Sequence, residues 1–445
     1  MIYFIFTTTG CNLHCTYCGN DPEEMCMPLK PTYTVEELQA FLEKDVKVSK
    51  EKPTLVLYGG EPLINLPFVA QLLEQVDANF VLQTNATLLD RLSRAQLEQF
   101  ASILVSIDGD KETVDRNRGA GTYDKCIAGC KAALEKGRIR NLVARGCAME
   151  GNDIFASAMH LLHHPTIPFT HFYWQLNVGF DAPMRDTFET WVRESYNPGI
   201  TKLVNEWIRV METEGKVMGI VPFLSLTESM LEMDEKGEVI EPRIWTGPEE
   251  IEEEETEDEF DIEDLLPAVK KAKEEMKKEK LAAAAARASS SATPSSSSSP
   301  ETMVRPDPRP LRPLRCGIGY NAFSIATDGK IAGCPCGVGE KWNMLSDDFK
   351  EVADPRASLC GKLKFTPPCT ECDIADLCGG RCTYCNHTKY WGGNYHRVVC
   401  NLTIRHLINE LIRVFPVVKG LLKSGKIERE PFTYPAEQYS LEVIP

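Results

Sequence analysis

Three cysteines close to the N-terminus, Cys11, Cys15 and Cys18, have the spacing of a metal-binding loop. Three and then two residues separate them, so one loop can place three thiolates on a cube-shaped iron–sulfur cluster and leave the fourth iron open. An open iron can take a small chelating ligand, which turns the cluster into a reaction centre. Zinc is the alternative, but it prefers four ligands, and the only local candidate for the fourth is His14.

At these residues the sequence resembles the radical S-adenosylmethionine (SAM) enzymes. Their signature is Cys-x3-Cys-x2-Cys with an aromatic residue, here Tyr17, before the last cysteine. The resemblance implies a [4Fe–4S] cluster whose open iron binds the amino and carboxylate groups of SAM and passes it an electron. SAM then splits into methionine and a 5′-deoxyadenosyl radical, which removes a hydrogen atom from the substrate.

The composition indicates a soluble, globular protein of 445 residues, 43% of them hydrophobic, with room for two or three domains. No apolar run approaches the roughly 20 residues of a membrane span, and the N-terminus lacks the features of a signal peptide. Seventeen cysteines in a large intracellular chain indicate metal or catalysis. We therefore expect a cytoplasmic protein with no membrane partner. The net charge of −16 also argues against nucleic acid as the main partner.

Short β-type runs alternate with helix-like stretches over the first part of the chain. The Thr34–Glu37 segment reads as a capping box that opens a helix. Such alternation predicts right-handed βαβ units and a parallel sheet. The number of repeats, six rather than eight, favours an open, partial (β/α)6 TIM-like barrel, an α/β fold whose chemistry collects at the carboxyl ends of the strands. The predicted strands are residues 2–7, 54–58, 79–84, 103–107, 141–145 and 169–176.

Gly59, Gly60 and Glu61 follow the second predicted strand. Glycines let the backbone approach a ligand closely, and exposed carbonyls with a carboxylate could hold an ammonium group. By resemblance this is the GGEP motif, which contacts the SAM amino group. A Gly-Gly pair alone is also a common turn, so the motif gains its meaning from the cysteine loop in front of it.

Polar residues also close the third and fourth predicted strands. Such residues are often only loop signals. Their positions match those where relatives hold the SAM ribose and carboxylate, and an arginine suits a carboxylate because its guanidinium can bind in a bidentate way. By resemblance the cofactor-binding candidates are Asn85, Ser106, Asp108 and Arg118.

Two further groups of polar residues precede and follow the last predicted strand. His160, His163 and His164 share a helical spacing but stand just before Pro165, where a helix ends. Histidine is favoured at helix C-termini by the dipole alone, so we expect a structural role rather than a metal site. Gln175 and Asn177 end the sixth strand and could face the substrate.

The composition then changes several times along the chain. A helical stretch containing Trp191 and Trp207 is spaced for one buried stripe. The acidic and then Ser- and Pro-rich segment after it cannot bury enough apolar surface to offset its ordering entropy, so we expect disorder. The predicted parts are a barrel (residues 1–178), a helical bridge (179–246), a linker (247–312), a cysteine-rich domain (313–407) and a C-terminal extension (408–445).

The cysteine-rich part has the spacing Cys-x12-Gly-x4-Cys, a gap, Cys-x2-Cys-x5-Cys-x3-Cys, a gap and Cys. Structural zinc would explain a single Cys-x-x-Cys. The complete pattern resembles the SPASM domain, a small α+β extension of peptide-modifying radical SAM enzymes. The resemblance implies two auxiliary iron–sulfur clusters, one on Cys316, Cys334 and Cys382 and a fully ligated one on Cys369, Cys372, Cys378 and Cys400.

The first auxiliary cluster lacks a ligand in this pattern, since no extra cysteine stands between Gly317 and Gly333. Cys336, Cys385 or Cys360 could supply it, or the iron could be open to a substrate thiolate. The cysteines left over, Cys26, Cys126, Cys130 and Cys147, are expected as buried apolar residues.

The sequence thus predicts an oxidoreductase that modifies a peptide or protein, for example by a cross-link or a thioether, and that receives electrons from a low-potential donor such as ferredoxin or flavodoxin. Relatives that oxidise sulfatases carry an aspartate base where this chain has Pro335, so that reaction is not expected. The alternatives are a radical SAM enzyme acting on a small molecule and a non-enzymatic iron–sulfur electron carrier. No residue is assigned to catalysis on the substrate itself.

Overall fold

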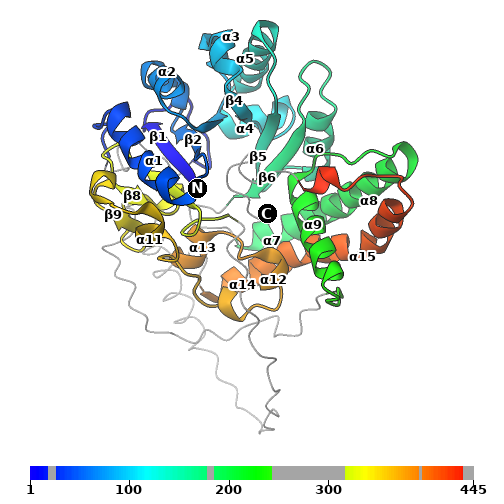
Figure 1. Ribbon diagram of the computed structural model, residues 1–445. Coiled ribbons are helices and arrows are strands. Elements are labelled where there is room, and N and C mark those ends of the chain that lie inside the picture. Colours follow the sequence, from blue (N-terminus) through cyan, green and yellow to red (C-terminus); the bar gives the residue numbers. More distant parts are fainter. Residues whose placement is uncertain (19–26, 178–184, 243–315, 390–392, 434–445) are drawn as a thin grey trace, which may run out of the picture.

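The computed structural model describes residues 1–18, 27–177, 185–242, 316–389 and 393–433 (Figure 1). The predicted disorder of residues 247–312 and the predicted burial of Cys26 lie outside these ranges. In the part of the chain that is described, no helix is both long and apolar enough to cross a membrane.

Six parallel strands form the first part of the sheet. They are neighbours in chain order, as right-handed βαβ units require. All six strands predicted from the sequence are confirmed, and with them the α/β partial barrel. The strands are β1 (Ile2–Thr8), β2 (Thr54–Gly59), β3 (Asn79–Thr84), β4 (Phe100–Ser106), β5 (Leu142–Ala148) and β6 (His171–Leu176).

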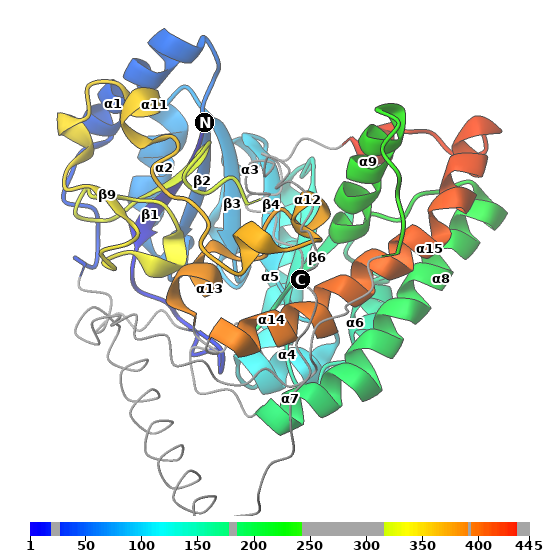
Figure 2. The ribbon, with the colours of Figure 1, turned by 90° about the horizontal axis from the view of Figure 1, so that it is seen from below.

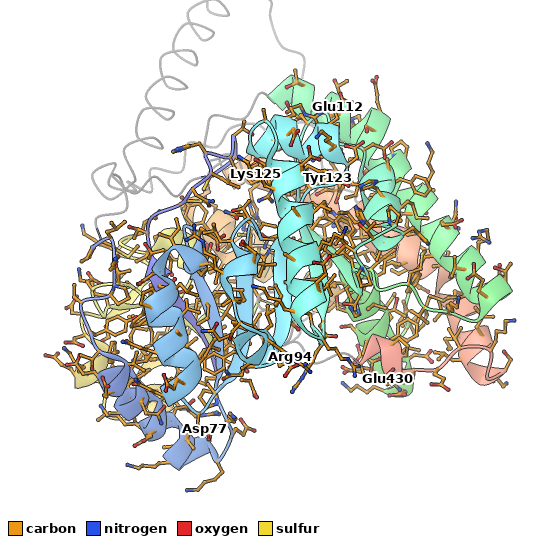
Figure 3. The ribbon with its side chains drawn as sticks, turned by 90° about the horizontal axis from the view of Figure 1, so that it is seen from above. Asp77, Arg94, Glu112, Tyr123, Lys125 and Glu430 are labelled. Carbon is orange, nitrogen blue, oxygen red and sulfur yellow. The ribbon has the colours of Figure 1, made fainter. Side chains whose placement is uncertain are left out.

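Helices cover the outer face of these strands (Figure 1). The predicted capping box is confirmed: Thr34 Oγ1 accepts from Glu37 N, and Glu37 Oε2 accepts from Thr34 N. In Figure 3 Glu112 and Lys125 mark the solvent side of this layer. The elements are α1 (Val35–Ser49), η1 (Pro62–Asn65), α2 (Leu66–Gln75), η2 (Leu89–Arg91), α3 (Arg94–Leu97), α4 (Lys111–Arg118), α5 (Thr122–Lys136) and α6 (Ile154–Leu162).

The sheet continues beyond the barrel strands into the C-terminal part of the chain. Strand β7 (Ala322–Ile325) pairs with β1 in parallel, and Tyr3 lies opposite Phe323. Strands β8 (Ile331–Ala332) and β9 (Met344–Ser346) follow antiparallel. A turn at Asp328-Gly329, with Gly329 at φ +87°, connects β7 to β8. A single nine-stranded sheet therefore joins the N-terminal and C-terminal cysteines.

Alternate residues of the barrel strands face away from the helices. Phe4, Val56 and Val143 are buried in a second core that also contains Cys316 and Cys334. Because side chains of a strand alternate between its two faces, this second core packs the inner face of the sheet against the C-terminal segment.

The helical stretch predicted after the barrel is also present. Helix α8 packs along α15, and the two helices lie side by side in Figure 2. The predicted stripe is confirmed, since Leu203 and Trp207 are fully buried. These helices are α7 (Arg185–Trp191), the π-helical η3 (Val192–Tyr196), α8 (Asn197–Glu214), α9 (Val221–Glu235) and α15 (Ile404–Lys423).

Short elements carry the C-terminal cysteines. They lie in the segment between β8 and α15, and most cysteines of that segment stand within them or directly beside them. They are η5 (Pro335–Gly337), η6 (Phe349–Glu351), α11 (Pro355–Leu359), η7 (Cys369–Glu371), α12 (Ala375–Cys378), α13 (Thr383–Thr388), α14 (Gly393–Leu402) and, after α15, η8 (Glu430–Phe432).

Candidate functional site

A cavity of about 270 Å³ lies at the carboxyl ends of the barrel strands. The loop after β1 lines it with all three cysteines of the N-terminal motif. Opposite them the C-terminal segment contributes four more cysteines, so both cysteine groups face one space. The cysteines that line it, in chain order, are Cys11, Cys15, Cys18, Cys147, Cys316, Cys334, Cys336 and Cys382, of which Cys147 belongs to strand β5.

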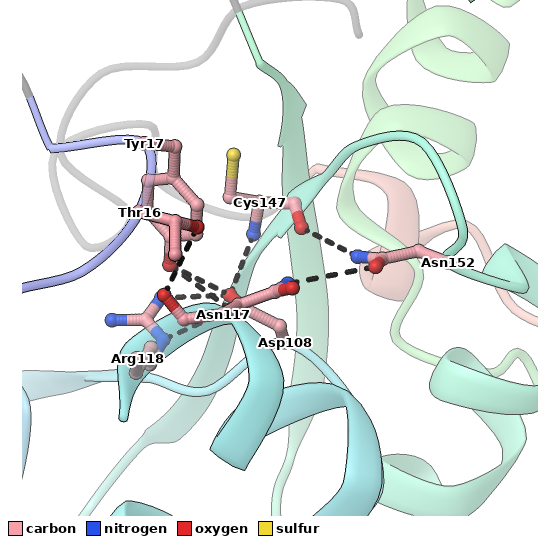
Figure 4. Close-up of polar contacts among 7 residues, drawn as sticks. All are labelled: Thr16, Tyr17, Asp108, Asn117, Arg118, Cys147 and Asn152. Atoms are coloured by element: carbon pink, nitrogen blue, oxygen red, sulfur yellow. Dashed lines mark hydrogen bonds and ion pairs between the residues drawn. The ribbon is translucent and has the colours of Figure 1, made fainter. Parts of the chain in front are cut away.

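The N-terminal cysteine loop is fastened to helix α4 by two hydrogen bonds. The backbone N–H of Thr16 donates to the Asn117 carbonyl over 2.8 Å, and Thr16 Oγ1 donates to the same oxygen over 3.2 Å. Figure 4 shows this attachment beside Tyr17. The C-terminal end of α4 therefore fixes the loop between Cys15 and Cys18.

The start of the same loop is fastened to the segment after β3. Asn85 Nδ2 donates to Asn12 Oδ1 over 2.8 Å, and Asn12 Nδ2 donates to Thr87 Oγ1 over 2.9 Å. Asn85 was predicted to bind the cofactor, and it does line the cavity. Its side chain also positions the loop that carries Cys11, a role that sequence reasoning missed.

Asp108 is the centre of a buried hydrogen-bond network (Figure 4). Its carboxylate accepts from Arg118 Nε over 3.0 Å and from Arg118 Nη2 over 2.7 Å. The Tyr17 hydroxyl, Asn117 Nδ2 and the Cys147 backbone N–H also donate to it. Asp108 does not line the cavity, whereas Arg118 and Tyr17 do, so Asp108 acts on the cavity through these two residues.

Arg118 lines the cavity, as does Ser106. Its guanidinium is buried and lies 5.4 Å from the centre of the Tyr17 ring. Asp108 engages Nε and Nη2, which leaves Nη1 as the nitrogen without a bond to that carboxylate. The network holds a positive charge beside the cysteine loop, where a ligand carboxylate would be attracted.

In the Gly59–Glu61 segment the glycines face the cavity, whereas the glutamate side chain is buried in the protein. Gly59 and Gly60 line the cavity. The Glu61 carboxylate turns into the protein, where it accepts from Thr84 Oγ1 over 2.8 Å, from Asn85 N over 2.8 Å and from Leu63 N over 3.1 Å. Burial raises the pKa of Glu61 to about 7, although these donors oppose the shift. Glu61 therefore orders the loop around Asn85.

Gly60 is required by the close approach of two loops. A Cβ atom at Gly60 would lie 2.3 Å from the carbonyl oxygen of Gly10. The backbone N–H groups of Gly60 and Glu61 donate to the carbonyls of Thr8 and Gly10. The segment after β2 is thus packed directly on the start of the cysteine loop.

The residues present fit an iron–sulfur cluster with SAM beside it. Three thiols face the cavity from one loop, Cys18 exposed and the other two half-buried. Burial raises the pKa of Cys15 to about 11, so this thiol gives up its proton when it binds iron. The glycine backbone and Arg118 border the same space. Among the described residues, no three His, Cys, Asp or Glu side chains form a group that could hold a single metal ion.

The second predicted set of C-terminal cysteines lies apart from the cavity lining. His396 Nε2 lies 3.9 Å from the Cys369 sulfur and 3.8 Å from the Cys400 sulfur. Cys372 directly follows η7, which begins at Cys369. Cys378, on α12, is buried. Sequence reasoning missed His396, because the spacing argument considered cysteines only.

Three other cavity residues were missed, although each stands in or at the end of a strand. Arg145 Nη2 donates to Gln175 Oε1 over 3.2 Å, and its guanidinium lies 5.1 Å from the centre of the Tyr173 ring. Tyr58 and Cys147 also line the cavity, together with Gln175 and Asn177. Cys147 was expected as a buried apolar residue, but it is half-buried at the wall. By contrast, Cys126 and Cys130 are buried as expected.

The histidines near residue 160 have a structural role, as predicted. The Tyr123 hydroxyl bonds His160 Nε2 over 2.8 Å and His164 Nε2 over 3.1 Å. His164 Nδ1 accepts from the backbone N–H of Ile167 and so ties the end of α6 to the next loop.

These features define a partial α/β barrel with a three-cysteine loop at the end of its first strand and a cofactor-sized cavity. Residues 5–153 match the sequence model of the Radical SAM superfamily. This part of the chain therefore belongs to that superfamily, and the membership implies a [4Fe–4S] cluster and SAM.

Curated relatives match about a third of the chain or less. Fe-coproporphyrin III synthase of Methanosarcina barkeri is 30% identical over 135 residues, which are 29% of this chain and 33% of that protein. The 7-carboxy-7-deazaguanine synthase of Methanothermobacter thermautotrophicus is 31% identical over 120 residues, 27% of this chain and 46% of that protein. The chain thus spans less than half the length of these two relatives.

Solved structures resemble nearly the whole chain. Native anSMEcpe with bound AdoMet is similar with a TM-score of 0.57 and 15% identity, over 95% of this chain and 100% of that one. At this identity the likeness shows the fold. It includes the region after residue 153, which the family model does not match.

Proposed function

We propose that the protein is a radical SAM enzyme that modifies a peptide or protein with the help of auxiliary iron–sulfur clusters in a SPASM-type C-terminal domain. The observation that carries the proposal is the single cavity lined by both cysteine groups. It lets a substrate sit between the loop of Cys11, Cys15 and Cys18 and the segment of Cys316, Cys334 and Cys382.

The chain's own residues have separable tasks in this proposal. Cys11, Cys15 and Cys18 would hold a cluster that, when bound, supplies the electron for splitting SAM into methionine and a deoxyadenosyl radical. Gly60 brings the backbone close to SAM, and Arg118 places a positive charge for its carboxylate. Arg145, Gln175 and Asn177, at the far wall of the cavity, would orient the substrate.

The oxidation balances if the C-terminal cysteines hold an electron acceptor. The substrate loses one hydrogen atom to the deoxyadenosyl radical, which becomes 5′-deoxyadenosine. The substrate radical then loses a proton and an electron as the new bond of the product forms. Cys316, Cys334 and Cys382 stand on the wall of the cavity, where they would hold the acceptor within reach of that electron.

The peptide substrate is supported by the fold. The similar protein anSMEcpe has also been solved with AdoMet and the Cp18Cys peptide, with a TM-score of 0.55 to this chain. A small-molecule substrate is the second candidate, because the relatives named above are synthases of a porphyrin and of a deazaguanine.

The first experiment tests SAM cleavage. The clusters are reconstituted under anaerobic conditions, SAM and a strong reductant are added, and 5′-deoxyadenosine is quantified. We expect production by the wild type and none by Cys15→Ala. Cys130→Ala is the control, because it removes a buried thiol that does not line the cavity. No 5′-deoxyadenosine from iron-loaded wild type, with or without candidate substrates, would contradict the proposal.

The second experiment separates the two substrate classes. Peptides encoded near the gene and a metabolite extract are incubated separately with the active enzyme, and products are followed by mass spectrometry. A SAM-dependent loss of two hydrogens from a peptide supports the proposal. A changed metabolite with unchanged peptides would establish the small-molecule alternative instead.

A further inference from the structure

Cys336 occupies a position that distinguishes it from the other unassigned C-terminal cysteines. It lies on the turn η5, two residues after Cys334, and its side chain is exposed to the cavity. Cys316, Cys334 and Cys382 line the same cavity, so the structure brings four cysteines together where the spacing pattern provides three.

The position of Cys336 places its thiol within this group. It is separated from Cys334 by Pro335 alone, on the same turn. Cys382, Tyr58 and Arg145 line the same cavity. A thiolate in this position would have two cysteines of the proposed cluster as neighbours, and a cation would partly offset its charge.

The turn that carries Cys336 is firmly held. Asn343 Oδ1 accepts from the Cys334 N–H over 2.6 Å, and Asn343 Nδ2 donates to the Cys334 carbonyl over 2.7 Å. The Gly337 N–H also donates to that carbonyl. The direction of the Cys334–Cys336 segment is therefore fixed before any metal binds, as a preorganised ligand set requires.

The other two candidates lie in unsuitable places. Cys385, on α13, is fully buried and does not line the cavity. The Cys360 sulfur lies 3.9 Å from the sulfur of Met1, at the opposite end of β1 from the cavity.

We propose that Cys336, as a thiolate, is the fourth protein ligand of the auxiliary cluster bound by Cys316, Cys334 and Cys382. The thiol proton leaves to solvent as the sulfur–iron bond forms. This inference rests on the proposed function and narrows the role of the auxiliary cluster within it. With four cysteine ligands the cluster has no iron left for a substrate thiolate, so it serves as an electron acceptor and not as an anchor for a substrate cysteine.

The test measures the clusters directly. The background variant combines Cys11→Ala, Cys15→Ala and Cys18→Ala, which leaves the two auxiliary clusters with about eight irons per chain. Cys336→Ala is added to this background, and Cys360→Ala serves as the matched control. Iron content, EPR after mild oxidation and thermal unfolding of the metal-free chains are recorded.

Under this proposal the background and the Cys360→Ala control resist mild oxidation. Cys336→Ala creates an open iron, which is lost on oxidation and leaves the EPR signal of a three-iron cluster, while the metal-free chain unfolds at an unchanged temperature. Identical iron content and EPR in Cys336→Ala and Cys360→Ala would overturn the ligand assignment alone. If the background variant itself binds no iron, the assumption that the chain holds auxiliary clusters would be overturned as well.

Discussion

At the scale of single residues, two buried carboxylates organise the cofactor side of the cavity. Asp108 and Glu61 were both predicted to bind SAM. Both are buried outside the cavity lining, and both accept hydrogen bonds from protein donors. Asp108 holds Arg118 and Tyr17, and Glu61 holds the loop of Asn85. A buried polar group costs free energy unless its partners are present, so both carboxylates make their neighbours rigid.

The Asp108–Arg118 pair leads to a stability prediction. Asp108→Asn leaves the Arg118 charge buried without its partner, so we expect a loss of about 3 kcal/mol in the free energy of unfolding. The matched control is Asp124→Asn, which breaks the exposed pair with Lys111 and should cost less than about 1 kcal/mol. Denaturant unfolding of both variants measures the difference, and equal losses would refute the prediction.

Glu61 leads to a prediction about pH. Its folded pKa of about 7 lies above the ordinary value of 4.5, so the folded state holds the proton more tightly. Stability should therefore fall as pH rises from about 4.5 to about 7, by up to about 3 kcal/mol. Glu61→Gln should flatten that fall. Denaturant unfolding of wild type and variant across this range tests it, and parallel curves would show that Glu61 does not titrate as expected.

At the scale of elements, the cysteine loop is held between the segments that follow β2, β3 and β4. Thr16 is attached to α4, Asn12 to the segment after β3, and Gly10 to the segment after β2. These attachments come from consecutive βαβ units, so the parallel sheet itself determines how the three thiols are presented.

Gly60→Ala tests the attachment to the segment after β2. The added Cβ would overlap the Gly10 carbonyl oxygen, so the two loops must separate. We expect at least a tenfold loss of SAM affinity, about 1.4 kcal/mol, with the iron content retained. Gly420→Ala in α15 is the control, because nothing lies within 4 Å of its Cβ position. Equilibrium dialysis with labelled SAM measures the affinity. Unchanged SAM binding by Gly60→Ala would contradict the expectation.

At the scale of the whole molecule, the C-terminal segment is part of the same sheet as the barrel. β7 pairs with β1 across more than three hundred residues of chain. The cavity forms because this pairing brings Cys316, Cys334 and Cys382 over the carboxyl ends of the barrel strands.

Phe323→Ala tests whether the two parts unfold together. Phe323 is fully buried on β7, with its ring centre 6.3 Å from that of Tyr3 on β1. We expect a loss of about 3 to 5 kcal/mol, typical of a buried phenylalanine, in one transition that tryptophan fluorescence and circular dichroism report alike. Two separate transitions, with only one of them shifted, would show that the barrel is an independent unit.

The sequence by itself determined the barrel strands and the cysteine motif. The strands are apolar runs bounded by loop residues, and a parallel strand buried on both faces depends on that local pattern. The spacing of Cys11, Cys15 and Cys18 is local too, since the three thiols of one loop need no distant partner to be recognised.

Only the tertiary structure decided which residues meet at the cavity. The β1–β7 pairing, the roles of Asp108 and Glu61, and the presence of Cys336 and Cys382 at one cavity all depend on contacts between segments distant in sequence. A hydrogen-bonding side chain or a thiol has many possible partners, and its residue type does not choose among them. The fold makes that choice, because burial and strand pairing fix which groups come within bonding distance.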